Sequence, residues 1–382
     1  MKRAPRILFF QRAIAPEHSA VGLLVSDLAE DLVRRGWEVA VAGTRSSSGV
    51  ADADLVDGVA YRRRFVRPVN RGSLASRAVL LPATWAAMFG ALRAGAVPDI
   101  LVTLTDPPLL VCAGAAYARR HGCRHVHWCQ DLYPEVAAAA GVVSGQGPIF
   151  RFLQWLSRRA LRRCDRVVAV GRCMQQKLAG VSPELITNWG RADEGTAPPP
   201  QGFHVLYSGN LGRAHDFEGL QAAAGLTQGR GIRWTVCGSG PQADVPRPPV
   251  ERKEPVSWEE FPRLLASASA HLITLRSEFC GLVVPSKIYD AAASARPLIF
   301  AGPEGSECAL AIREAGMGLV VPDRDGPALA AAALRLAGDP GLCRKMSLAA
   351  LGFSARHRLT SSGEAFDRLL REVLCRRREP GG

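Results

Sequence analysis

The sequence has no long apolar run. Although 47% of its 382 residues are hydrophobic, no stretch approaches the roughly 18–20 consecutive apolar residues of a membrane-spanning helix. The first ten residues contain four consecutive apolar positions, well short of the roughly 7–15 in the core of a signal peptide. A charged fraction of 22% is typical of a soluble chain. These features argue against membrane-embedded and secreted proteins, and we expect a cytoplasmic location.

The cysteines also lack any ordered pattern. The ten cysteines form no CxxC pair and no Cys/His spacing of a zinc site. They are scattered through apolar contexts, as is typical of reduced and mostly buried thiols. His125 and His127 alternate onto one face of a strand-like run, but no third ligand accompanies them. We therefore expect no metal site and no bound cofactor.

Positive charge is concentrated in the first half of the chain. Residues 1–190 carry 25 Lys and Arg against 14 Asp and Glu, a net charge of +11, whereas residues 191–382 carry 23 against 21, a net charge of +2. This asymmetry suggests that one domain meets a polyanion or an anionic membrane. Arginine-rich coding from a GC-rich genome is an alternative, but it would bias both halves alike.

Two segments of the first half have the composition of helices at a membrane interface. Ala78–Arg93 follows a basic cluster and contains Trp85, Met88 and Phe89. A core helix with a solvated basic flank is the alternative for this segment. Ile149–Leu161 is rich in aromatic residues and has arginines in and just after its last turn. We expect an anionic membrane surface, and not nucleic acid, as the partner.

Apolar runs and helical patterns alternate along most of the chain. This alternation predicts the α/β class with two Rossmann-like domains. The first loop lacks a GxGxxG fingerprint, so a dinucleotide-dependent dehydrogenase is not supported. The proline-rich stretch at 195–200 cannot continue a helix or a sheet. We place an N-terminal domain at 1–190, a linker at 191–202, a second domain at 203–358, and at 359–382 a C-terminal helix that can pack back on the first domain.

The stretch at 281–297 predicts a ligand-binding turn. An apolar run breaks at Pro285 and continues into a helix for which Ser286 is the candidate N-cap. Lys287 lies in the first turn, where helices prefer acidic residues, so a nearby anion explains it better than helix stability does. A solvated lysine is the alternative. Asp290 follows one turn after Ser286 and can face the same pocket, where its carboxylate suits sugar hydroxyls.

Glycines follow apolar runs at three other places. Gly22 opens the first helix, and Gly209 and Gly212 precede Arg213 at the end of a later strand. Backbone amides at such turns can approach an anion, and the arginine can neutralise phosphate. A tight turn with an exposed arginine is the alternative. Gly238 ends a further strand and leaves space for a base or a sugar.

Acidic residues follow the strand that ends at Cys129. Asp131 and Glu135 lie at its carboxyl end, where open parallel sheets bind ligands. These carboxylates can act as a base, bind hydroxyls, or simply cap the helix that follows Pro134.

Several of these segments, taken in order, resemble the retaining family-four glycosyltransferases of GT-B fold, in particular the bacterial surface-polysaccharide branch. The resemblance covers essentially the whole chain, and Ser-Gly-Asn-Leu-Gly-Arg together with Pro-Ser-Lys is its discriminating pair. Its segments are Thr105–Pro108, Gln130–Glu135, Asn188–Trp189, Tyr207–Arg213, Val284–Lys287 and Ala291–Pro297.

The resemblance implies roles for the residues singled out above. Arg213 and Lys287 look like the diphosphate-binding cations, and Asp131 stands at the acceptor loop. Asp290 falls where the family has a ribose-binding glutamate, and Glu278 is a candidate for the first glutamate of that pair, although it lies farther from Asp290 than in the family. The remaining donor-side residues are Gly22, Gly209, Asn210, Gly212, Gly238 and Ser286.

The resemblance further implies an activity and a location. A sugar would pass from a nucleotide-diphosphate donor, such as a UDP-sugar, to a hydroxyl of a lipid-linked or polysaccharide acceptor, with retention of anomeric configuration and without a required metal. Asp131 would orient or deprotonate that hydroxyl. The basic first domain fits a peripheral position on the inner face of the cytoplasmic membrane. One alternative is a GT-B-fold nucleotide-sugar epimerase or hydrolase. Another is a degenerate non-catalytic subunit, which is suggested by Asp290 in place of the family's glutamate and Ala295 in place of its usual glycine.

Overall fold

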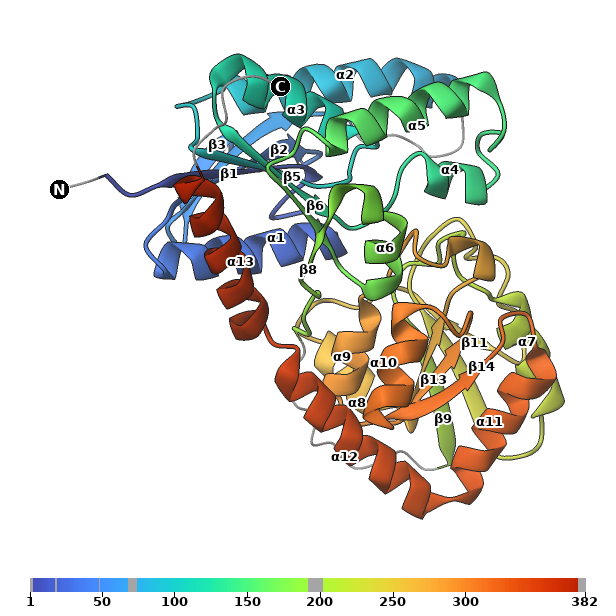
Figure 1. The fold of residues 1–382 in the computed structure, drawn as a ribbon. Helices are drawn as coiled ribbons and strands as arrows, with labels where there is room; N and C mark the ends of the chain where they lie inside the picture. Colours follow the sequence, from blue (N-terminus) through green and yellow to red (C-terminus); the bar gives the residue numbers. More distant parts are fainter. Residues whose placement is uncertain (1–2, 18, 48, 68–73, 192–201, 377–382) are drawn as a thin grey trace.

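The protein consists of two α/β domains joined by a C-terminal helical segment (Figure 1). The computed structural model describes residues 3–17, 19–47, 49–67, 74–191 and 202–376, and for residues 74–81 it describes the backbone alone. Each domain is built around one largely parallel sheet covered by helices. The expected α/β class with two Rossmann-like domains is therefore confirmed.

The first domain contains an eight-stranded sheet in the order β3-β4-β2-β1-β5-β6-β7-β8. Only the edge pair β3 and β4 is antiparallel among these strands. The central strands are buried on both faces, as parallel sheets require. The strands are β1 (Arg6–Ala13), β2 (Glu38–Arg45), β3 (Ala53–Val56), β4 (Val59–Phe65), β5 (Ile100–Thr103), β6 (Arg124–Cys129), β7 (Arg166–Ala169) and β8 (Glu184–Leu185).

Helices cover both faces of this sheet (Figure 1). They are α1 (Ala20–Arg34), α2 (Leu74–Arg93), α3 (Leu110–His121), α4 (Glu135–Ala139), α5 (Pro148–Leu161), α6 (Arg172–Lys177) and the short 3₁₀ turn η1 (Ala179–Val181).

The second domain contains a six-stranded parallel sheet in the order β11-β10-β9-β12-β13-β14. Its strands are β9 (Phe203–Ser208), β10 (Ile232–Cys237), β11 (Glu251–Lys253), β12 (Ala270–Thr274), β13 (Leu298–Ala301) and β14 (Gly318–Val321). Its helices are α7 (Glu218–Leu226), α8 (Phe261–Ala266), η2 (Ser277–Phe279), α9 (Lys287–Ala293), α10 (Glu307–Ala315), α11 (Gly326–Gly338) and α12 (Pro340–Arg356).

The last helix, α13 (Leu359–Cys375), leaves the second domain and packs against α1 of the first (Figure 1). Phe366 is buried there and contacts Trp128 edge to face, with ring centroids 4.8 Å apart. The indole nitrogen of Trp37 donates to Asp367 at 2.6 Å. The C-terminal segment thus completes the core of the first domain.

The segment expected to link the domains, 191–202, lies outside the described residues except for its two ends. Arg191 at the first end is held by both domains. Its guanidinium donates to Asp27 of α1 at 2.7 Å, and its backbone amide donates to Asp290 of α9 at 2.7 Å. The start of the linker is therefore fixed by ionic and backbone contacts.

For the described part of Ala78–Arg93, the structure supports the core-helix alternative over a helix at a membrane interface. Met88 of α2 is fully buried in a core cluster that includes Leu8 and Phe10 of β1. Trp85 and Phe89 are only half-buried, and they pack against the same cluster. Apolar burial against the sheet therefore explains these side chains, as in the core-helix alternative.

Candidate active site

The two segments singled out for acceptor and donor meet where the domains touch. The Leu132 amide, just after β6, donates to the Leu282 carbonyl at 2.9 Å. Asp131 and Val283 form an isolated antiparallel bridge. The carboxyl end of β6 is thus joined directly to the turn that leads into α9, which begins at Lys287.

Lys287 places its ammonium group inside the second domain. The Nζ atom is shielded from solvent and has no hydrogen-bond partner within the described residues. It lies 3.6 Å from the centre of the Tyr207 ring, and a methyl group added at Gly209 would contact it at 3.4 Å. Burial lowers the pKa of Lys287 to about 7. A cation that costs this much desolvation is normally matched by an anion.

Two glycine turns interlock beside this ammonium. Gly238 has φ of +148°, and a Cβ there would lie 1.9 Å from the Gly209 carbonyl oxygen. Only glycine fits such a position. The Gly209 amide donates to the Cys237 carbonyl at 2.9 Å, and the approach of other amides of this turn to an anion stays a prediction. Asn210 accepts the Tyr207 hydroxyl at 2.7 Å through its carbonyl.

Arg213 follows this turn and reaches across the domain boundary. Its guanidinium donates to the carbonyl of Ala140, at the end of α4, at 3.1 Å, and the residue is exposed. Gly212 lies just before it and is half-buried. Arg213 therefore stands at the junction, with a charge free to move toward a ligand, and its predicted role stays a prediction.

Three further predicted donor-side residues lie in or near α9. Ser286 occupies the N-cap position of α9, but its side chain makes no capping hydrogen bond, contrary to expectation. Asp290 lies one turn after Lys287 in α9. Its carboxylate accepts the amide of Arg191, at the start of the linker. Glu278 forms an ion pair with Arg324. The roles predicted for these two carboxylates stay predictions.

Gly22 likewise has a local reason to be glycine. The Ser19 hydroxyl caps α1 by accepting the Gly22 amide at 2.9 Å. A Cβ at Gly22 would lie 2.7 Å from the Ala13 carbonyl oxygen. Close packing against β1 and helix capping therefore explain this glycine, and its predicted place beside the donor stays a prediction.

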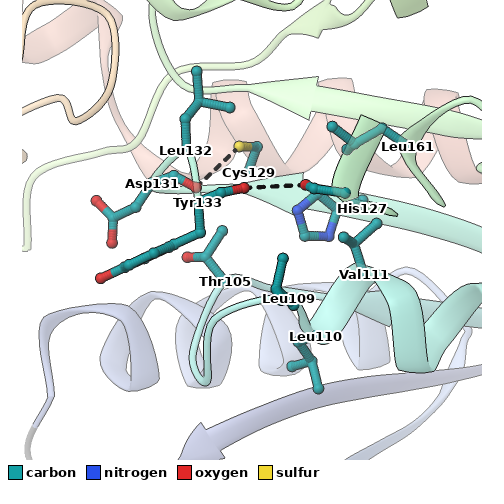
Figure 2. Close-up of a pocket in the computed structure, with 11 residues that line it drawn as sticks. Thr105, Leu109, Leu110, Val111, His127, Cys129, Asp131, Leu132, Tyr133 and Leu161 are labelled. Carbon is teal, nitrogen blue, oxygen red and sulfur yellow. Dashed lines mark hydrogen bonds between the residues drawn. The ribbon is translucent and has the colours of Figure 1, made fainter. Parts of the chain in front are cut away.

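Asp131 is the acid of the first domain at this junction. Desolvation, with a smaller contribution from Asp106, raises the pKa of Asp131 to about 7. Its carboxylate and the Tyr133 hydroxyl lie on the same side of the loop, away from His127 (Figure 2). Asp106 is itself paired with Arg12 at 2.8 Å. Asp131 can therefore exchange a proton near neutral pH, as a general base must.

A small cavity lies behind this loop (Figure 2). Its volume of about 20 Å³ is on the scale of one water molecule and cannot hold a sugar. Its lining residues include Thr105, Leu109, His127, Asp131, Tyr133 and Ser157. The polar ends of Asp131 and Tyr133 point out of it (Figure 2).

His125 and His127 belong to the core. Both rings bond to the Thr103 hydroxyl, at 2.8 and 2.9 Å, and both are buried. Burial lowers the pKa of each to about 3, so both are neutral at ordinary pH. Among the residues that the structure describes, no group of three or more His, Cys, Asp or Glu side chains is placed to hold a metal ion.

One further contact at the junction was not predictable from the sequence. Arg172, at the start of α6, binds the carboxylate of Glu307 in α10 through its amide at 2.5 Å and its guanidinium at 3.1 Å. The same guanidinium reaches the exposed Glu314 at 2.6 Å. Glu307 is nearly buried, and Gly171 leaves no room for a side chain beside it. These residues lie 135 positions apart, so no local pattern could pair them.

Comparison with known sequences gives a family match and a related protein. Residues 21–189 match the model of glycosyltransferase family 4. A probable glycosyltransferase, WbjE of Pseudomonas aeruginosa, is 26% identical over 257 residues, which span 61% of this chain and 64% of that protein. The alignment thus covers less than two thirds of the relative's length.

Solved structures extend the likeness to the whole fold. Sucrose-phosphate synthase from Thermosynechococcus elongatus superposes with a TM-score of 0.79 at 18% identity, covering 97% of this chain and 99% of that one. HepE of Anabaena, solved in complex with UDP-glucose, gives a TM-score of 0.68 at 13% identity, covering 96% and 99%. At these identities the likeness concerns the fold.

Proposed function

Because residues 21–189 match the model of glycosyltransferase family 4 and the chain has the GT-B fold of its solved neighbours, we propose that the protein transfers a sugar from a nucleotide-diphosphate donor to a hydroxyl acceptor. The observation that carries the proposal is the buried ammonium of Lys287, which lies beside Gly209 in the second domain and has no hydrogen-bond partner within the described residues. A UDP-sugar is the donor we favour, since UDP-glucose is the ligand named for the HepE structure.

Donor binding would use the charges of the second domain. A diphosphate next to Lys287 would supply the missing counter-ion and raise the pKa of its ammonium again. Arg213 would exchange its contact with the Ala140 carbonyl for a phosphate oxygen. Both cations would then stabilise the charge that develops on the departing nucleotide diphosphate. No step of this scheme requires a resident metal ion.

Acceptor binding would use the first domain. Asp131, with its pKa of about 7, would orient the attacking hydroxyl or remove its proton. This role is supported by the contact between the Leu132 amide and the Leu282 carbonyl, since the loop of Asp131 thereby adjoins the turn that leads to Lys287. We propose transfer with retention of anomeric configuration, as the family resemblance implies.

We further propose a lipid-linked or polysaccharide acceptor and a peripheral position on the inner face of the cytoplasmic membrane. The net charge of +11 over residues 1–190 supports attraction to an anionic surface. Within the described part of the chain, none of the helices has the length and apolar character needed to span a bilayer.

Incubation with candidate nucleotide sugars tests this function. The expected result is release of UDP only when an acceptor is present, with a product whose anomeric configuration, determined by NMR, equals that of the donor. Activity unaffected by a chelator is expected. Conversion of the donor without an acceptor would instead identify an epimerase or hydrolase. A chain that binds no nucleotide would be a non-catalytic subunit.

A further inference from the structure

Helix α5 presents large apolar side chains to solvent. Ile149, Phe152 and Trp155 are 70%, 58% and 55% exposed, and Val142, shortly before the helix, is 65% exposed. Positions three apart lie on neighbouring parts of a helix surface. The rings of Phe152 and Trp155 accordingly stack, with centroids 6.0 Å apart. Burial within the described chain does not account for this aromatic face, in contrast to α2.

Positive charge surrounds these side chains. Residues 148–163 contain five arginines and no acidic residue. The guanidinium of Arg159 lies 5.7 Å from the centre of the Trp155 ring. All five arginines are exposed, at positions 151, 158, 159, 162 and 163. We call this surface, with Val142, Ile149, Phe152 and Trp155, the α5 face.

We propose that the α5 face is the surface through which the protein docks on an anionic lipid bilayer. Aromatic side chains prefer the headgroup level of a membrane, and arginines at that level bind lipid phosphates. A second copy of the chain is the poorer occupant, because two such faces would bring five positive charges against five. The lipid surface supplies the complementary charge and the apolar depth together.

The opposite side of α5 holds the acceptor loop. The Ser157 hydroxyl donates to the Tyr133 carbonyl at 3.0 Å, and the Gln154 amide donates to Glu135 at 2.8 Å. Ser157 also lines the cavity beside Asp131. A bilayer bound to the outer side of α5 therefore lies one helix away from Asp131. This step rests on the proposed function, since it explains how a membrane-borne acceptor would reach the site.

Vesicle flotation with the full chain tests the docking surface. The vesicles contain phosphatidylcholine with or without phosphatidylglycerol. Substituting Arg159, Arg162 and Arg163 by Gln is expected to lower the partition coefficient on the anionic vesicles on the order of 100-fold, at about a fivefold loss per arginine. Phe152→Ser with Trp155→Ser is expected to lower it at least about tenfold.

A matched control lies on α12 of the second domain, where Leu348 is 70% exposed next to two exposed basic residues. Leu348→Ser with Arg344→Gln and Lys345→Gln should bind vesicles like the parent. Circular dichroism confirms that each variant is folded. Equal loss in the α12 and α5 variants would overturn the proposal, as would vesicle binding that neither α5 variant weakens.

Fluorescence quenching by brominated lipids separates insertion of the helix from binding elsewhere. Quenching is expected in the parent and reduced in Trp155→Phe, whereas quenching unchanged by this substitution would overturn the assignment. Transfer to a membrane-borne acceptor should fall in the α5 variants, while transfer to a soluble acceptor analogue is retained. Vesicle binding by a chain with no transferase activity would contradict the proposed function and still support the docking surface. If the α5 face bound a protein and the chain did not bind vesicles, the lipid assignment would be overturned.

Discussion

The ammonium nitrogen of Lys287 lies 3.6 Å from the centre of the Tyr207 ring. The ring face attracts the cation, yet within the described residues no hydrogen-bond acceptor reaches it. Burial consequently lowers the pKa of Lys287 to about 7. The folded protein thus maintains a poorly solvated cation in its second domain, which an anionic ligand would stabilise.

The first prediction concerns the pH dependence of stability. The folded-state pKa of Lys287 lies below the usual 10.5, so the unfolded chain binds this proton more tightly. The resulting destabilisation is complete below about pH 7 and disappears as pH rises toward 10.5. Lys287→Met should therefore resist urea better than the parent at about pH 6, with the advantage shrinking as pH rises. A Met variant that gains no stability at the lower pH would contradict this.

The second prediction concerns proton uptake on donor binding. A diphosphate beside Lys287 restores the pKa toward its usual value, so UDP binding at about pH 8 should take up protons. Calorimetry in two buffers with different ionisation enthalpies measures this uptake. UDP affinity should fall as pH rises above about 7. Lys287→Met should remove the uptake, and uptake that persists in this variant would point to a different titrating group.

The third prediction concerns Asp131. Its pKa is raised from 3.8 to about 7, so the carboxylate form becomes available only as pH rises through neutrality. We expect kcat/KM for the acceptor to rise with pH through about 7. Asp131→Asn should lower kcat by about 100-fold or more without weakening UDP binding. A pH profile that Asp131→Asn leaves unchanged would exclude this carboxylate as the titrating group.

The fourth prediction concerns the interlocked glycine turns. Gly238→Ala would place a Cβ against the Gly209 carbonyl and force a backbone conformation that alanine avoids. This variant should lose UDP affinity while its second domain remains folded. Gly225→Ala in α7 is the matched control, because a Cβ there meets nothing within 4 Å and alanine favours the helix. Equal UDP affinity in both variants would show that the turn does not shape the donor site.

The fifth prediction concerns the ion pair between Arg172 and Glu307, which joins the two domains. Arg172→Ala leaves the nearly buried Glu307 carboxylate without its partner, which should cost about 1–3 kcal/mol after allowance for the partial exposure of the arginine. Glu314→Gln removes only an exposed partner of the same arginine and should change stability little. Urea unfolding measures both. A larger loss from Glu314→Gln would mean that the buried pair does not hold the domains.

The sequence was sufficient for the architecture and for the segments of the site. The alternation of apolar runs and helices predicted both sheets, and the segments of Asp131 and Lys287 do meet where the domains touch. Strand order and helix packing are long-range properties, however. The pattern of Ala78–Arg93 could not reveal that Met88 faces the sheet and not a membrane.

Side-chain partners were the least predictable feature. Ser286 and Gly22 were each judged from their neighbours in sequence. In the folded chain the Ser286 side chain makes no capping hydrogen bond, and the Gly22 amide donates to Ser19. Asp290 bonds to Arg191, 99 positions away, and Arg172 bonds to Glu307 in the other domain. Such pairs follow from how the two domains pack, which no local spacing encodes.

The most direct test of the account is the affinity of UDP for Lys287→Met, measured by titration calorimetry at about pH 7 beside Lys345→Met on α12. Loss of a charge-assisted contact to phosphate should weaken binding by at least about tenfold in the first variant. The exposed Lys345 should be dispensable. Equal UDP affinity in the parent and both variants would contradict the assignment of the buried ammonium to the donor diphosphate.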